Sequence, residues 1–168
     1  MSDKRKVLST ADICDLHGEE CSILDPIFKI YGKKQDCHGK IYSIKLDEEA
    51  YHLRLLLQKQ GNGQVVVVDA GGAYCAVLGD QLVELALKNN WKGLVINGYI
   101  RDINILNKMD FPVWALGACP KRSIKKSPAK ESIPAEFAGV RMYPGDYIYA
   151  DTDGILVVDK PFDNVFYS

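Results

Sequence analysis

Gln64-Val-Val-Val-Val-Asp69 is an unbroken run of β-branched residues, and it ends in the turn-forming stretch Ala70-Gly71-Gly72. A run without polar alternation is typical of a strand that is covered on both faces, as in the sheets of α/β proteins. Working outward along the chain, the next apolar stretches are Leu94-Val-Ile-Asn97 and Pro112-Val-Trp-Ala-Leu-Gly117. We expect these stretches to be three strands of one buried sheet.

Helical spacing of apolar residues separates these strands. Gly79-Asp80 begins a segment that carries Leu82 and Leu85 on one face, and Arg101-Asp102 opens another that carries Leu106. Strands that alternate with helices favour a layered α/β domain, in which neighbouring strands are parallel and the crossovers are right-handed. The sequence therefore predicts the α/β fold class.

The rest of the chain predicts shorter elements. A helix is expected to begin after Ser9, a strand at 39–46, a second helix at 47–60, and short strands at 137–142, 147–149 and 154–158. The segment from Lys121 to Lys130 is rich in lysine and proline. We expect it to form an exposed loop that lies apart from the candidate site.

Length and charge set limits on the organisation and on the partners. The chain has 168 residues and a net charge of −1, from 21 Lys+Arg and 22 Asp+Glu. This length predicts a single domain over 1–168, with a flexible N-terminus at about 1–8 and a C-terminal tail at about 159–168 that packs on the body or on a neighbouring subunit. A near-neutral chain lacks the surplus of cations that phosphate neutralisation needs, so we expect no direct contact with nucleic acid.

The apolar stretches and the cysteines indicate the cellular compartment in which we expect the protein. No stretch reaches the roughly 20 apolar residues of a membrane helix, and the charged start does not resemble a signal peptide. The five cysteines are odd in number and lack the CxxC spacing, which argues against a disulfide framework and a structural zinc site. We expect a cytoplasmic protein without a membrane partner.

Two loops at strand ends concentrate glycine and charge. In α/β sheets, ligands gather at the carboxyl ends of strands beside helix N-termini. The N–H groups of residues 79–82 could hold a carboxylate or a phosphate, while Arg101 could grip a substrate carboxylate or keto oxygen. Asp102 suits a hard cation such as Mg²⁺, and Asp80 could orient a water in a proton relay. Because the chain lacks both GxGxxG and the P-loop lysine, a nucleotide is not indicated.

Each of these features also has a purely structural interpretation. An Arg-Asp pair is usually a surface feature, an aspartate at a helix start is usually a cap, and a glycine pair after a strand is usually a turn. It is the placement in two successive strand-to-helix loops that favours a ligand site. The adjacent pair Cys37-His38 is a weaker candidate for a nucleophile, because neighbouring residues rarely face each other productively.

The motifs taken together resemble a known family. They are Val68-Asp69-x-Gly-Gly72, Leu78-Gly79-Asp80-x-Leu82, Gly93-x-Val95-Ile96-Asn97-Gly98, Arg101-Asp102, Phe137-Ala-Gly-Val140, Pro144-Gly-Asp146 and Asp151-x-Asp153-Gly154. From about Thr10 to Val158, the chain resembles the family of ribonuclease E activity regulator A and its aldolase relatives. Members of that family have a fold that resembles the swivelling β/β/α fold of phosphohistidine domains, and they commonly form trimers.

The resemblance implies a reaction. Aldolase members cleave 4-hydroxy-4-methyl-2-oxoglutarate and 4-carboxy-4-hydroxy-2-oxoadipate to pyruvate and a second 2-oxo acid, and they decarboxylate oxaloacetate. Their signature is an aspartate, twenty intervening residues and Arg-Asp, as in Asp80, Arg101 and Asp102 here. The resemblance implies a class II aldolase, a carbon–carbon lyase, whose cofactor is a divalent cation, Mg²⁺ or Mn²⁺.

The resemblance also implies a role for each site residue. Gly79, Asp80, Gln81 and Leu82 would bind the 2-oxo acid substrate, and Asp80 would assist a catalytic water. Arg101 would bind substrate and stabilise the enolate, and Asp102 would hold the metal. An acidic residue from a neighbouring subunit assists in the aldolases, and the sequence does not place it.

The resemblance leaves a second function open. Regulator members bind and inhibit ribonuclease E, and they can lack the Arg-Asp pair. The resemblance therefore also implies ribonuclease E or its RNA helicase partner as a binding partner of this chain. This chain keeps the pair, which favours the enzyme.

Overall fold

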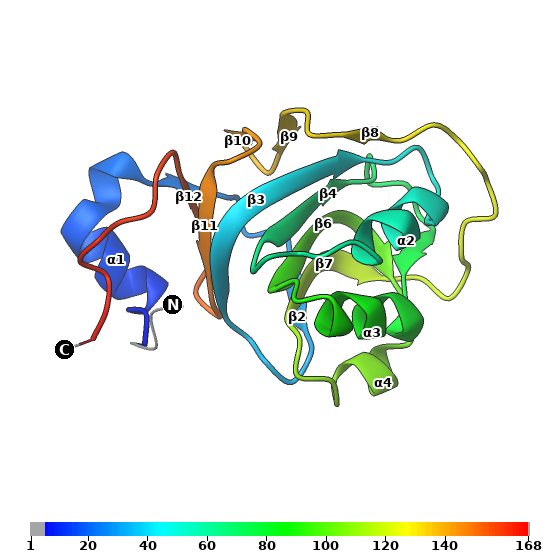
Figure 1. The fold of residues 1–168 in the computed structure, drawn as a ribbon, viewed down its shortest axis with the longest axis horizontal. Coiled ribbons are helices and arrows are strands. Elements are labelled where there is room, and N and C mark those ends of the chain that lie inside the picture. The colour runs from blue at the N-terminus through cyan, green and yellow to red at the C-terminus, as the bar shows by residue number, and fades with distance from the viewer. Residues whose placement is uncertain (1–5, 168) are drawn as a thin grey trace.

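A single large sheet, curled into a half-barrel, forms the centre of the molecule (Figure 1). The computed structural model describes residues 6–167. The strand order along the sheet is β1-β12-β11-β3-β4-β6-β7-β2, while β5 pairs with β6 and β8 pairs with β3. The bounds are β1 (Ser22–Ile23), β2 (Lys29–Tyr31), β3 (Cys37–Lys45), β4 (Val65–Asp69), β5 (Ala76–Leu78), β6 (Gly93–Ile100), β7 (Val113–Ala118), β8 (Lys130–Glu131), β11 (Tyr147–Ala150) and β12 (Ile155–Val158). The fold is therefore mixed α/β, as the sequence predicts.

The parallel centre of the sheet is confirmed. Strands β3, β4, β6 and β7 run parallel to one another, with Val66 opposite Leu94 and Val68 opposite Ile96. Val66 and Val68 pack under the helices, whereas the alternate side chains of β4 pack inside the half-barrel. Since both faces of β4 are buried, every side chain of the valine run gains the roughly 1.5–3 kcal/mol of full burial, and no polar residue interrupts it.

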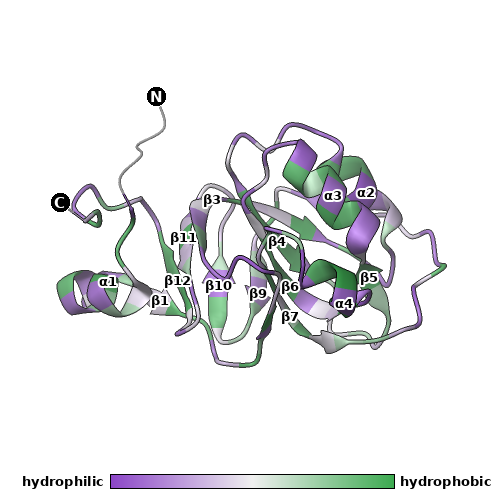
Figure 2. Cartoon of the chain, turned by 90° about the horizontal axis from the view of Figure 1, so that it is seen from below, coloured by the Kyte–Doolittle hydropathy of each residue, from purple (hydrophilic) through white to green (hydrophobic). Residues whose placement is uncertain are grey.

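Three helices cover one face of this sheet (Figure 2). They are α2 (Tyr51–Leu57), α3 (Asp80–Lys88) and α4 (Ile103–Leu106). Helices α2 and α4 are shorter than the sequence predicts. Helix α2 begins at Tyr51 rather than 47 because Glu48 has a left-handed φ of 49°, and the Glu49 carboxylate accepts a hydrogen bond from the His52 N–H at 3.1 Å, which caps the first turn.

The opposite face is closed by a small hairpin. Strands β9 (Ala135–Phe137) and β10 (Val140–Met142) pair antiparallel and cover the inside of the half-barrel. The single strand predicted at 137–142 is wrong, because Ala138 and Gly139 both have positive φ, 51° and 74°, and turn the chain back on itself. The strands predicted at 147–149 and 154–158 are confirmed as β11 and β12.

Helix α1 (Thr10–His17), the short 3-10 helix η1 (Gly18–Glu20) and the C-terminal tail lie together at one end of the molecule (Figure 1). The Ser9 hydroxyl accepts a hydrogen bond from the Asp12 N–H at 3.1 Å, so the predicted cap is confirmed. Of the N-terminus predicted to be flexible, residues 1–5 lie outside the described part of the chain. The Leu8 N–H donates to the Val165 carbonyl at 2.7 Å. Among the described residues, no helix is long and apolar enough to cross a membrane.

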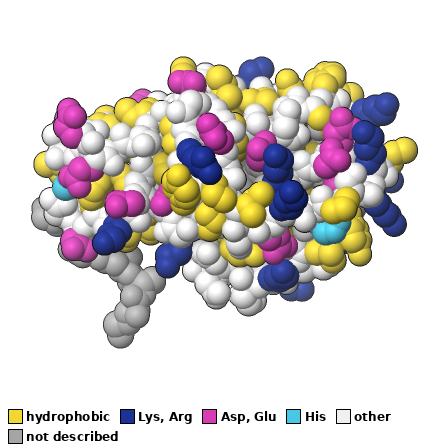
Figure 3. Space-filling model, turned by 90° about the horizontal axis from the view of Figure 1, so that it is seen from above, with side chains coloured by type: hydrophobic (Ala, Val, Ile, Leu, Met, Phe, Trp, Pro, Cys, Tyr) yellow, Lys and Arg dark blue, Asp and Glu magenta, His cyan; other side chains and the backbone are white. Residues whose placement is uncertain are grey.

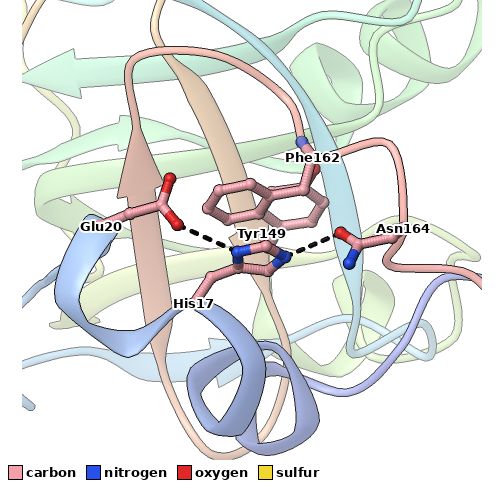
Figure 4. A network of polar contacts seen from close by, with 5 residues as sticks. All are labelled: His17, Glu20, Tyr149, Phe162 and Asn164. Carbon is pink, nitrogen blue, oxygen red and sulfur yellow. Dashed lines mark hydrogen bonds and ion pairs between the residues drawn. The ribbon is translucent and has the colours of Figure 1, made fainter.

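The tail is fastened to α1 through His17 (Figure 4). The His17 ring stacks on Phe162 with 4.0 Å between ring centroids and an interplanar angle of 7°. Its Nε2 lies 2.7 Å from the Asn164 Oδ1, and its Nδ1 lies 3.1 Å from the Glu20 Oε1. Both neighbours are acceptors, so they suit an imidazolium, in which both ring nitrogens donate.

This contact is expected to depend on pH. The hydrogen bond to Asn164, followed by that to Glu20, raises the pKa of His17 above its ordinary 6.5. The contribution of His17 to holding the tail is then complete below about pH 6.5 and is lost as pH rises through the raised pKa. Hydrogen exchange of the amides of residues 162–167, corrected for intrinsic rates, should therefore show protection that falls with rising pH in the wild type and not in His17→Gln. Equal pH profiles for the two proteins would contradict this role.

Candidate functional site

The first predicted loop is fixed by hydrogen bonds at the end of β4. The Asp69 Oδ1 accepts from the Gly71 N–H at 3.0 Å and from the Asn97 Nδ2 at 3.1 Å. Gly71 and Gly72 have φ of 66° and 70°, a region that favours glycine. These contacts hold the end of β4 against the middle of β6. Asp69 is thus occupied in the turn that leads the chain towards Gly79.

Strand β5 carries the chain from this loop to the start of α3. It is a short apolar strand, parallel to β6, which the sequence analysis missed inside the glycine-rich loop. The Leu78 carbonyl accepts from the Arg101 N–H at 3.0 Å. This bond brings the start of α3 beside Arg101 and Asp102, although twenty residues separate Asp80 from Arg101 in the sequence.

The Asp102 carboxylate packs directly against the backbone at the start of α3. Its Oδ2 accepts from the Asp80 N–H at 3.4 Å and lies 3.8 Å from the Arg101 Nε. A Cβ atom added to Gly79 would be only 2.5 Å from the same oxygen, so glycine is what permits this approach. Asp102 has a left-handed backbone, with φ of 63°. Aspartate tolerates that region better than most residues, and here the strain places a carboxylate at a cavity.

A cavity of about 400 Å³ lies over this arrangement. The structure brings all the residues of the predicted site to its lining: Gly79, Asp80, Gln81, Leu82, Arg101 and Asp102. The side chains of Arg101 and Asp102 are 37% and 34% exposed, so both are open to a ligand. The geometry confirms that these residues meet, while their individual roles stay predictions.

The basic segment after β7 does not lie apart from the site, so that expectation is wrong. Arg122, Lys125 and Lys126 line the same cavity. The Ala76 N–H donates to the Lys121 carbonyl at 2.8 Å, and the Ser123 N–H donates to the Ala76 carbonyl at 3.3 Å. These bonds hold the segment beside β5. Strand β7 is parallel to β6, and its carboxyl end therefore delivers the chain to the same edge of the sheet, a signal that was present in the sequence.

Helix α2 supplies the remaining wall of the cavity, which the sequence analysis also missed. Ala50, Tyr51 and Arg54 line it. Seen from above, Lys and Arg side chains gather at the end of the molecule where α2 and the segment after β7 lie (Figure 3). Nothing in the spacing of α2 marks Arg54, because helical periodicity identifies the buried face and not the solvent-facing residue that borders a cavity.

The cysteines do not supply a nucleophile here. Burial raises the pKa of Cys37 to about 12, and the neighbouring His38 directs its Nδ1 to the Tyr147 hydroxyl at 2.9 Å. The weak candidate Cys37-His38 is therefore a protonated thiol beside a histidine that is engaged elsewhere. Burial also raises the pKa of Cys75, which precedes Ala76 in the chain but does not itself line the cavity.

Known proteins are similar to this chain over most of its length. A candidate 4-hydroxy-4-methyl-2-oxoglutarate aldolase of Pseudomonas fluorescens is 40% identical over 153 residues, covering 90% of this chain and 94% of that protein. A structure from Geobacillus kaustophilus, described as an S-adenosylmethionine:2-dimethylmenaquinone methyltransferase, has a TM-score of 0.89 at 36% identity and covers 92% of this chain and 97% of its own. The RNA-processing inhibitor RraA from Thermus thermophilis has a TM-score of 0.89 at 32% identity, covering 95% and 98%.

A family profile also matches most of the chain. The profile described as RraA-like, Aldolase/RraA, matches residues 10–157. That range contains β5, the start of α3 and the Arg101-Asp102 pair, all of which line the cavity. The chain belongs to the RraA-like aldolase family.

Proposed function

We propose that the protein is a divalent-metal-dependent lyase that cleaves substrates of the 4-hydroxy-4-methyl-2-oxoglutarate type to pyruvate, and that it decarboxylates oxaloacetate through the same enolate. The observation that carries this proposal is the meeting of Asp80, Arg101 and Asp102 at one cavity, with the Asp102 Oδ2 in contact with the backbone of Asp80. The 40% identity to a candidate aldolase supports it. A cavity with paired carboxylates and several cations suits an oxygen-rich anion better than a methyl-donor nucleoside.

The carboxylates fit a hard divalent cation. Asp80 and Asp102 are the acidic residues that line the cavity, and within residues 6–167 no group of three or more His, Cys, Asp or Glu side chains is suited to hold a metal. Mg²⁺ often takes one or two protein carboxylates and completes its shell with water and substrate oxygens. Asp102 would hold such an ion, and Asp80 would lie beside it. When bound, the ion supplies a Lewis acid for the negative charge of the enolate.

Arg101 supplies fixed positive charge where the reaction develops negative charge. Breaking the C–C bond leaves its electron pair on the pyruvyl unit as an enolate, and protonation at carbon completes pyruvate. The Arg101 guanidinium would donate hydrogen bonds to the substrate carboxylate or keto oxygen and stabilise that charge. The bond from the Arg101 N–H to the Leu78 carbonyl holds the backbone of Arg101 beside the start of α3.

The start of α3 would position the other groups. Residues 79–82 form the start of a nine-residue helix, where the Asp80 N–H already donates to Asp102 and the other N–H groups would face a bound anion with the positive end of the dipole. Asp80 would orient the water that exchanges protons with the substrate. Anion binding and water orientation would both use residues 79–82. The lack of a side chain at Gly79 lets the Asp102 carboxylate approach the same residues.

The metal requirement gives the test of this function. Pyruvate release from oxaloacetate and from 4-hydroxy-4-methyl-2-oxoglutarate, followed by NADH-coupled reduction of pyruvate, should disappear in excess chelator and return with added Mg²⁺ or Mn²⁺. Reactions without protein at each metal concentration correct for spontaneous decarboxylation. Undiminished activity in the dialysed protein with chelator would overturn the proposed mechanism.

We also propose that the chain acts as a cytoplasmic homotrimer, in which a neighbouring copy completes the site, and that its closest fold class is the swivelling β/β/α type. Support comes from the family and from the openness of Arg101 and Asp102, each more than a third exposed in the single chain. Light scattering after gel filtration tests the trimer, for which the expected mass is about three times 18.7 kDa.

A regulator of ribonuclease E is the second candidate function. It is favoured by the TM-score of 0.89 to the RNA-processing inhibitor from Thermus thermophilis. A regulator that works through its surface should bind the ribonuclease or its helicase partner, and slow RNA cleavage, even after Arg101→Ala and Asp102→Asn. A lyase without regulator activity should do neither.

A further inference from the structure

Positive charge dominates the rim of the cavity. Asp80 and Asp102 are the acidic residues of the lining, against five basic ones. The basic residues are Arg54, Arg101, Arg122, Lys125 and Lys126. Arg101 alone is enough to hold the head of a 2-oxo acid. The cavity therefore has more cations than the reacting end of the proposed substrate requires. The additional cations fit a ligand that carries a second anionic group.

Three of these cations already have partners. Arg101 lies beside Asp102, at 3.8 Å from Nε to Oδ2. Lys125 forms an ion pair with Glu48, and this hydrogen bond raises the pKa of Lys125. The Lys126 Nζ lies over the ring of Tyr51, 5.7 Å from its centroid. The last two contacts also fasten the segment after β7 to the start of α2, across the cavity.

Arg54 and Arg122 are the cations that remain. Neither guanidinium has a hydrogen bond or an ion pair with any residue in the described part of the chain. Arg54 reaches the cavity from α2 and Arg122 from the segment after β7, so they come from elements other than those that carry Asp80 and Asp102. Both guanidinium groups line the same cavity, and a carboxylate bound there would offer each of them an acceptor.

We propose that Arg54 and Arg122 form a subsite for the distal carboxylate of the substrate, so that the protein selects 2-oxo acids with a carboxylate at each end over those with one. This inference rests on the proposed function, because it takes the reacting 2-oxo acid to lie at Arg101 and Asp102. The planar guanidinium fork matches a carboxylate and binds it through two parallel hydrogen bonds. In the retro-aldol cleavage the distal carboxylate lies outside the bond that breaks, so Arg54 and Arg122 would act on specificity there.

The test compares two ligands that differ only at the far end. The probes are 2-oxoglutarate and 2-oxopentanoate, titrated calorimetrically in the presence of Mg²⁺ into the wild type, Arg54→Gln, Arg122→Gln and the double variant. Each single substitution should weaken 2-oxoglutarate by about 10- to 100-fold, the effect of one charged hydrogen bond, and should leave 2-oxopentanoate within about threefold. Arg→Lys at either position should restore part of the binding, because charge returns without the fork.

Lys121→Gln is the matched control, since Lys121 adjoins Arg122 but does not line the cavity. Its affinity for both ligands should equal that of the wild type. Equal losses for both ligands in the arginine variants, or no loss for 2-oxoglutarate, would overturn the subsite. The same variants assayed with 4-hydroxy-4-methyl-2-oxoglutarate, whose distal carboxylate stays on the second 2-oxo acid, should show the change mainly in KM rather than kcat.

The two proposals can fail separately. If the wild type prefers 2-oxoglutarate and the variants lose this preference, but no pyruvate is released from any substrate, then the subsite stands and the lyase function fails. If pyruvate is released and Arg54 and Arg122 do not affect the preference, then the lyase function stands and the subsite fails.

Discussion

Arg101→Ala is expected to lower kcat/KM for pyruvate release from oxaloacetate by about 10²–10³-fold, the usual cost of removing one preorganised group that stabilises developing negative charge. The side chain is 37% exposed, and its one ion pair among residues 6–167 is the 3.8 Å contact to Asp102, so its loss should leave the fold unchanged. Because the substitution removes a cation that acts on the enolate, kcat should fall as well as kcat/KM.

Two further variants sharpen this result. Arg101→Lys keeps the charge without the fork, and it should recover only part of the activity. Arg141→Ala removes an arginine of β10 that lies over the ring of Tyr143 and does not line the cavity. This substitution should leave kcat/KM unchanged. Full activity in Arg101→Ala, with an unchanged metal requirement, would remove Arg101 from the mechanism.

Gly79→Ala is the second substitution with a large expected effect. The new Cβ would lie 2.5 Å from the Asp102 Oδ2, so the carboxylate must move away from the position that it now holds against the Asp80 N–H. The backbone of Gly79, with φ of −144° and ψ of −171°, is extended and accepts alanine without strain. The damage is therefore confined to Asp102. Misplacing such a group typically costs 10–100-fold in metal affinity or activity.

A metal titration separates this effect from a loss of folding. The concentration of Mg²⁺ needed for half-maximal pyruvate release should rise by about 10–100-fold in Gly79→Ala, while the thermal midpoint stays close to that of the wild type. Gly18→Ala is the control, since a Cβ at Gly18 meets nothing within 4 Å. An unchanged metal requirement in Gly79→Ala would show that Asp102 does not hold the ion.

The centre of the fold and the floor of the site could be predicted from sequence for the same physical reason. The valine run of β4 has no polar residue because both of its faces are buried, and parallel neighbours deliver their carboxyl ends to one edge. Gly79-Asp80 and Arg101-Asp102 follow such ends, so they were expected to meet. At these positions the local sequence pattern and the topology of the sheet predict the same arrangement.

The walls of the site could not be predicted in the same way. Strand β5 has only three residues and is defined by its pairing with β6, which sequence periodicity does not contain. The end of β7 places the segment with Arg122 at this edge, but its lysines and prolines are typical of a solvated loop, and the sequence does not show the backbone bonds that hold it beside Ala76. Helix α2 is shortened by the left-handed Glu48, a local conformation that helical spacing does not reveal.

The left-handed backbone of Asp102 has an evolutionary consequence. At φ of 63°, glycine, asparagine and aspartate are the residues that the position accepts at little cost. Asparagine lies one nucleotide change from aspartate and preserves the turn, but it removes the negative charge on which the proposed metal chemistry depends. A lineage with this fold can therefore lose catalysis in one mutational step without losing stability, and its surface is then free to be selected for binding other proteins.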